Sequence, residues 1–383
     1  MLFIAGIIGI FLSDLKADVF DSTLSVRGVG MGGAYTAVVN NADALFYNPA
    51  GLSRTGGVYW TIADPNLGIG NATALQELAD SSGSTSGSFA DTLSGIYGEP
   101  VWFGGGAKTA IVFPFFGAAY YQQINFELLL DNPVYPNLNV KGYWDKAVVL
   151  GFAFPVVPGF VYGGMNVRRV SRMGADTSFT GSTLSNLDAD AIINQIQNKS
   201  LGYGVDLGFN MVIPAPFVKP IFSFVWKNVG TTSYRSEDAS ISPPSDEEDM
   251  ILAAAVEVDV PLVTVTPSIE FRGLNKTSEQ IGKKIHMGLE LDLPLIAVRG
   301  GFYQGYYTAG LGLGMGPLNL DLATYAVERG AYPGQHEDRR YVFQLAIDIG
   351  VGIGFNLFDD SKAGPGASPP ASSSRFRKLK VRR

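Results

Sequence analysis

The stretch that decides the fold is Leu201–Met211, LGYGVDLGFNM. Large apolar residues stand at the odd positions, and glycine, aspartate and asparagine stand at the even ones. A period of two predicts a β-strand with two different faces. The second face of a strand in a soluble sandwich is usually charged, whereas here it is small and polar. The pattern is therefore typical of a strand that faces lipid on one side and a crowded, wet lumen on the other.

The same alternation recurs in Lys284–Leu293 and Tyr341–Leu357, and it continues less cleanly along most of the chain. The predicted fold class is all-β, an antiparallel transmembrane β-barrel of about 14 strands with an N-terminal plug. An even number of strands places both ends of the barrel on one side. The predicted strands are 57–64, 103–113, 117–130, 146–154, 160–172, 201–213, 218–228, 250–260, 264–274, 284–293, 295–304, 306–315, 317–328 and 341–355.

The connections between these strands fall into two classes that alternate, except for a short connection near Gly305. Short turns bear proline, as at Pro214 and Pro294, whereas the predicted loops 131–145, 173–200, 229–249, 275–283 and 329–340 are long and polar. Short turns on one side and long loops on the other are typical of outer-membrane barrels, with the turns in the periplasm. Apolar residues at near-helical spacing within 182–199 and 89–96 predict helices in two loops, which either pack on themselves or form a landing site for an apolar ligand.

Composition supports a barrel and excludes several kinds of site. Charged residues make up 16% of the 383 residues, below the roughly 25% of soluble domains, yet no apolar run approaches the ~18 residues of a membrane-spanning helix. The chain has no cysteine and two histidines, which excludes thiol chemistry and a histidine-rich metal site. The pair Glu290 and Asp292 is interpreted as lumen lining rather than as an acid–base pair, so we expect no enzyme activity, no cofactor and no metal.

The two ends of the chain are predicted to lie outside the barrel. Residues 1–17 contain an apolar run of about eleven residues, which suits a signal peptide although no positive charge precedes it. Residues 359–383 form a basic tail rich in proline and serine. From Ser361 to Arg383 the tail carries seven lysines and arginines and no acid, so with a net charge of −7 the preceding 360 residues carry −14. We interpret this tail as disordered rather than as a nucleic-acid-binding segment.

The remaining segment, 18–56, is predicted to be a plug inside the barrel of residues 57–358. Its centre, VRGVGMGGAYTAVVNNADALFYNPAGL over Val26–Leu52, is dense in glycine and alanine, and small residues allow close packing against a wall. The pattern G-x-G-x-x-G at Gly28–Gly33 lacks the preceding strand and the following acidic residue of a dinucleotide site. Asn48 precedes Pro49 and is therefore expected to be extended or turned.

The motifs GMGGAYTA and NADALFYNPAGL resemble the N-terminal signature of the outer-membrane long-chain fatty-acid transporter (FadL/TodX) family, to which outer-membrane shuttle proteins of gliding bacteria are related. About 25 residues carry the resemblance. It implies a location in the outer membrane of a Gram-negative-type bacterium and a hydrophobic small molecule, such as a fatty acid, as ligand. Outer-membrane lipid and the barrel assembly machinery are the other expected partners.

The candidate site residues lie in the predicted plug and at strand positions predicted to face the lumen. An apolar cavity of a transporter would be lined by Met31, Phe46 and Tyr47, and the gate would be Asn48, Pro49 and Ala50. Three arginines are predicted to face the lumen: Arg168, Arg272 and Arg299. Each would bind either the carboxylate of a ligand or a neighbouring acid. The candidate acids are Glu270, Glu290, Asp206 and Asp348.

A further candidate concerns the wall itself. Pro114 and Gly117 stand in a strand-like stretch, and proline removes a hydrogen-bond donor from the ladder. Pro114 therefore lies either in a periplasmic turn or at a break in the wall, and the family resemblance implies sideways release of ligand through a kink in an early strand.

The sequence thus predicts an outer-membrane transporter for passive uptake of long-chain fatty acids or other small hydrophobic molecules, gated by the plug. The alternative is a non-transporting barrel that serves as a docking or assembly partner for secreted proteins. A polar porin would need an open lumen, which the plug disfavours.

Overall fold

The computed structural model describes residues 25–74, 76, 97–131, 134–180, 199–236 and 243–351. The predicted signal peptide, the basic tail and the helical signals in 182–199 and 89–96 lie outside these ranges. No helix among the described residues is both long and apolar enough to cross a membrane.

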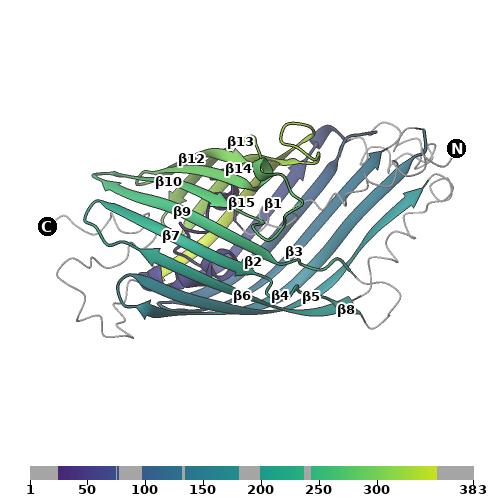
Figure 1. The fold of residues 1–383 in the computed structure, drawn as a ribbon. Coiled ribbons are helices and arrows are strands. Elements are labelled where there is room, and N and C mark those ends of the chain that lie inside the picture. The colour runs from purple at the N-terminus through teal and green to yellow at the C-terminus, as the bar shows by residue number, and fades with distance from the viewer. Residues whose placement is uncertain are drawn as a thin grey trace.

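The described chain forms a closed antiparallel barrel of fourteen strands, as predicted (Figure 1). Neighbouring strands pair in chain order, β1 pairs with β15, and the short β8 (Arg235–Ser236) adds to the end of β6. The barrel strands are β1 (Val58–Gly70), β2 (Val101–Phe113), β3 (Phe116–Asp131), β4 (Asn137–Val157), β5 (Val161–Thr180), β6 (Lys199–Val212), β7 (Val218–Lys227), β9 (Asp249–Val260), β10 (Val263–Phe271), β11 (Ile285–Asp292), β12 (Ile296–Tyr303), β13 (Tyr306–Met315), β14 (Leu318–Glu328) and β15 (Glu337–Val351).

Alternation along each strand separates an apolar outer face from the lumen. On β4, Val148, Leu150 and Phe152 are exposed, whereas Ala147 and Val149, which alternate with them, are buried. The exposed residues form the belt that contacts lipid in a transmembrane barrel. The prediction that Arg168, Arg272 and Arg299 face the lumen is confirmed.

Strands β4 and β5 are longer than predicted, and the assignment of 137–145 and 173–180 to loops was wrong. The extra residues continue the wall beyond the apolar belt on the side of the long loops. Their apolar side chains, among them Leu138, Val140 and Phe179, are buried in a cluster with Ala74, which belongs to the β1–β2 connection. This packing, rather than strand propensity, stabilises the extension.

Strand β1 is also longer than predicted and contains an irregularity. Its register shifts between Thr61 and Ala63 against β15, and between Thr61 and Asp64 against β2. Such a bulge changes the phase of the strand. As a result Thr61 and Asp64 both face the lumen, and Pro65 faces outward.

Candidate functional site

The N-terminal segment, residues 25–57, lies within the barrel and consists of short helical turns. α1 (Val26–Gly30) begins at Ser25, whose Oγ accepts a hydrogen bond from Gly28 N at 3.3 Å. α2 (Ala44–Tyr47) is followed by the 3₁₀ helix η2 (Pro49–Arg54). Asn48 is extended, as predicted, with φ −155° and ψ 104°, and its Oδ1 accepts a hydrogen bond from Ala50 N at 3.1 Å.

The segment approaches the wall most closely where the wall carries glycine. The Met31 carbonyl lies against Gly288 of β11, and the Pro49–Ala50 backbone lies against Gly164 of β5. At both wall glycines an added Cβ would overlap a backbone atom of the segment. The glycine-rich lumen face of the strands is therefore a contact surface for the segment.

Buried ion pairs hold the α1 end to β11, β12 and β14. Glu290 accepts hydrogen bonds from Arg27 Nη2 and from Arg299 Nε, each at 2.6 Å, and Arg299 Nη1 donates to Asp321 at 2.6 Å. Glu290 and Arg299 are almost fully buried. Because Glu290 neutralises two arginines, it is the central residue of this network, which we call the α1 latch (Arg27, Glu290, Arg299 and Asp321).

The other two predicted arginines are also paired with acids. Arg272 donates to Glu270 at 2.7 Å and to the Gly33 carbonyl at 2.6 Å, and Glu270 in turn accepts from Thr36 N at 2.9 Å. Arg168 donates to Asp206 at 2.8 Å. All three arginines therefore take the predicted alternative of lumen ion pairing, and two of these networks include the N-terminal segment.

A second buried charge cluster was not predicted from the sequence. Lys108 Nζ of β2 lies 2.6 Å from Asp43 of the segment and 3.2 Å from Asp64 of β1. Arg54, at the end of η2, pairs with Glu257 of β9. Burial raises the pKa of the Asp43 carboxyl, but the charge and hydrogen bond of Lys108, the Ser25 hydroxyl and the Arg27 charge together hold that pKa below its usual 3.8. The sequence feature that could have revealed this cluster is Lys108, the single charged residue in the strand VWFGGGAKTAIVF.

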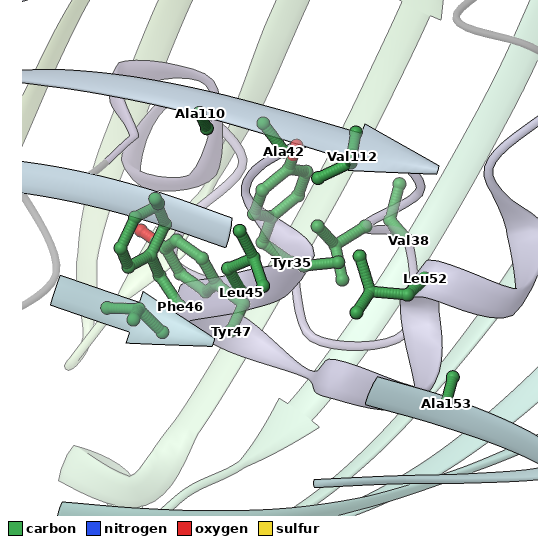
Figure 2. Packing of buried hydrophobic residues seen from close by; sticks show 14 of the residues in the cluster. Tyr35, Val38, Ala42, Leu45, Phe46, Tyr47, Leu52, Ala110, Val112 and Ala153 are labelled. Carbon is green, nitrogen blue, oxygen red and sulfur yellow. The ribbon is translucent and has the colours of Figure 1, made fainter. Parts of the chain in front are cut away.

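The α2–η2 end packs in an apolar environment (Figure 2). Met31, Phe46 and Tyr47 are 0%, 7% and 1% exposed, and they belong to one cluster with the lumen side of β2–β5, β7 and β9. The wall side chains of this cluster are small or aliphatic with one tyrosine: Ala110, Val112, Ala119, Tyr121, Ala147, Val149, Ala153, Val170, Ile221, Ala253 and Ala255. The residues predicted to line a cavity are thus packed against the wall.

Between the ion pairs of Asp43 and Arg54, a few hydrogen bonds join the α2–η2 end to its surroundings. The Asn48 amide contacts the Asn210 amide at 2.6 Å and donates to the Thr36 carbonyl at 3.2 Å, and Asn166 Nδ2 donates to the Leu45 carbonyl at 2.8 Å. The predicted gate residues Asn48, Pro49 and Ala50 therefore lie together against β5 and β6.

Pro114 lies in the two-residue turn between β2 and β3, the first of its two predicted alternatives. The ladder beside it pairs Val112 with Gly117. The missing side chain of Gly117 leaves room for Leu45 of α2. An opening of the wall at Pro114 and Gly117 stays a prediction. The shifts in strand register near these residues lie in the neighbouring strand β1.

Comparison with known proteins finds fold similarity only. No family model matches the chain, and no curated protein matches it. The fold is similar to those of solved hydrocarbon channels and transporters. The Pseudomonas putida toluene transporter TodX is 11% identical over 88% of this chain and 100% of its own, with a TM-score of 0.47. The CymD monoaromatic hydrocarbon channel is 10% identical over 87% and 99%, with a TM-score of 0.47. CdiB from Acinetobacter baumannii is 10% identical over 76% and 60%, with a TM-score of 0.33.

Proposed function

We propose that this barrel admits small hydrophobic molecules across the outer membrane and that its N-terminal segment is the gate. The observation that carries the proposal is the apolar lumen wall around α2 and η2. A channel for polar solutes would present polar side chains there, because its lumen is filled with water. An apolar wall behind a movable segment suits a hydrophobic molecule, because its transfer from water to an apolar environment is favourable.

The two ends of the segment differ in how they are held, which supports a direction of movement. The α1 end is fixed by the α1 latch, and separating a buried ion pair costs roughly 3–5 kcal/mol. The α2–η2 end also has buried ion pairs at its two limits, Asp43–Lys108 and Arg54–Glu257, but the residues between them contact the wall mainly through apolar side chains, which an apolar ligand could replace. We therefore expect α2 and η2 to move away from β4–β6 while α1 stays in place.

The ion pairs also bear on the ligand. Arg168, Arg272 and Arg299 each already bind a carboxylate, so a fatty-acid head group would have to displace a protein acid. An uncharged hydrophobic molecule needs no such exchange. Among the predicted ligands, the geometry favours a hydrocarbon over a fatty acid.

The test uses two reversible cross-links in a chain that has no cysteine of its own. Asn48→Cys with Gly208→Cys would join η2 to β6, where the Asn48 side chain lies against the Gly208 position. Gly30→Cys with Ala323→Cys would join α1 to β14, where the two Cβ positions are 3.5 Å apart, within disulfide range. Cells that express each variant, and cells without the gene, are assayed for uptake of labelled toluene and labelled oleate.

Oxidation of the Asn48–Gly208 pair should abolish toluene uptake, and reduction should restore it. Oxidation of the Gly30–Ala323 pair should leave uptake unchanged, because α1 is expected to stay in place. Equal uptake by cells with and without the gene would refute transport of either molecule.

The second candidate is a non-transporting barrel that docks secreted proteins. The packing of Met31, Phe46 and Tyr47 favours it, because a filled lumen needs no ligand. On this hypothesis neither cross-link nor loss of the gene would change uptake of either labelled molecule.

A further inference from the structure

Four positively charged side chains gather on the outer face of the wall at β4, β5, β6 and β8: Lys146, Arg169, Lys199 and Arg235. All four are exposed. The strand register places them in three neighbouring rows, because residues that pair across strands lie on the same face. Lys146 aligns with Ser171, Leu201 and Arg235 in the middle row. Arg169 lies in the row below with Tyr203, and Lys199 lies in the row above with Met173.

This basic patch lies where the apolar belt ends. In the rows below it, towards the short turns, the outer face carries Leu150, Phe152 and Met165, which are 52%, 44% and 43% exposed. Aromatic side chains flank the patch, with Lys146 Nζ 4.3 Å from the Trp144 ring centroid and Tyr203 63% exposed. Tryptophan and tyrosine at the edge of an apolar belt mark the level of the lipid head groups. The patch is therefore at head-group depth on the long-loop side.

The four cations have no counter-ion within the described part of the chain. By contrast, the inward arginines of the same strand, Arg168 and Arg172, are each paired with aspartate. On the far side of the barrel the outward-facing Arg339 is paired with Glu337. Among the described residues, these four exposed cations thus lie close together without an acidic partner, in a protein whose net charge is −7.

We propose that this patch binds the phosphate groups of a phosphorylated lipid of the outer leaflet. Rows on a strand are spaced ~7 Å apart and strands ~4.8 Å apart, so the four cations cover roughly 10–15 Å, which matches a head group with two separated phosphates. Arginine and lysine are the residues that bind phosphate through charge-assisted hydrogen bonds. The acyl chains of the same lipid would lie on the belt below the patch, which a free phosphate could not use. The inference does not depend on transport.

The experiment titrates the purified barrel in detergent with lipid A that carries both phosphates, and measures bound lipid per barrel by native mass spectrometry. The test variant is Lys146→Gln/Arg169→Gln/Arg235→Gln. The matched control is Arg339→Gln, which removes one outward cation that already has a partner. Heat-dependent mobility on a gel verifies that both variants form barrels.

The wild-type barrel and the control should bind lipid A equally, and the triple variant should bind on the order of 100-fold more weakly, at roughly fivefold per cation removed. Binding of the wild type should fall with salt, and inorganic phosphate at the same concentration should not compete. Undiminished binding by the triple variant would overturn the proposal. So would equal binding of dephosphorylated lipid A, or displacement by inorganic phosphate.

Discussion

Glu290 is the acid that lies between the two cations of the α1 latch, Arg27 and Arg299. In Glu290→Gln the half-buried Arg27 and the buried Arg299 would share a neutral amide. Loss of one member of a buried charge network costs roughly 3–5 kcal/mol, so α1 should detach from β11 and β12. The expected result is a higher open probability in planar-bilayer conductance recordings.

Glu337→Gln is the matched control for that substitution. Glu337 pairs with Arg339 at the outer surface, at 42% side-chain exposure, where a pair contributes about 1 kcal/mol or less. Its conductance should equal that of the wild type. A Glu290→Gln barrel as closed as this control would show that the latch does not hold the segment.

Gly164 tests the close contact at the predicted gate. A methyl group in Gly164→Ala would overlap the Pro49–Ala50 backbone, and overpacking of this kind costs roughly 1–3 kcal/mol. Residues 48–50 should therefore become accessible to protease in the folded barrel. Gly300→Ala is the control, because the nearest atom to an added Cβ there is Thr308 O at 3.7 Å; cleavage at equal rates in both variants would contradict the predicted contact.

The lowered pKa of Asp43 predicts how the segment responds to acid. Ser25, Tyr35 and Lys108 are its hydrogen-bonding partners. The pKa of Asp43 is lower in the folded state. The charged carboxylate therefore stabilises the folded state fully above the ordinary pKa of aspartate, and this stabilisation is lost only as the pH falls through the lowered pKa. Conductance should stay low from pH 8 to about 5, whereas Asp43→Asn should open at neutral pH. Opening of the wild type near pH 6 would identify another group as the sensor.

At the scale of elements, α1 and η2 should differ in local stability. Amide hydrogen exchange measures local opening. The α1 latch holds α1, whereas the residues of α2 and η2 between Asp43 and Arg54 have mainly apolar contacts with the wall. We expect the amides of Ala44–Tyr47 and of residues 50–54 to exchange faster than those of Val26–Gly30. The reverse order would place the moving part at α1.

The elements also show what the sequence could and could not predict. Alternation located all fourteen barrel strands because a lipid face and a lumen face differ in chemistry at every second residue. It missed residues 137–145 and 173–180, whose apolar side chains are buried by residues from other parts of the chain, among them Ala74, Val101 and Leu128. It also missed the pairs Lys108–Asp43 and Arg54–Glu257, since their partners lie far apart in the chain and meet only after the barrel closes.

At the scale of the whole molecule, the alternation of long and short connections predicts orientation. In a cysteine-free chain, Ser278→Cys in a long connection and Leu295→Cys in a short turn can be labelled separately. A membrane-impermeant maleimide should label Ser278→Cys in intact cells and Leu295→Cys only after lysis. Labelling of Leu295→Cys in intact cells would reverse the orientation.

The pairing of β1 with β15 has a consequence for biogenesis. The seam joins strands from the two ends of the described chain, and residues 25–57 precede the first of them while lying inside the finished wall. Pairing of such distant strands is slow because of the long chain between them. We therefore expect closure of the seam, which also completes the wall around residues 25–57, to be a late step in assembly.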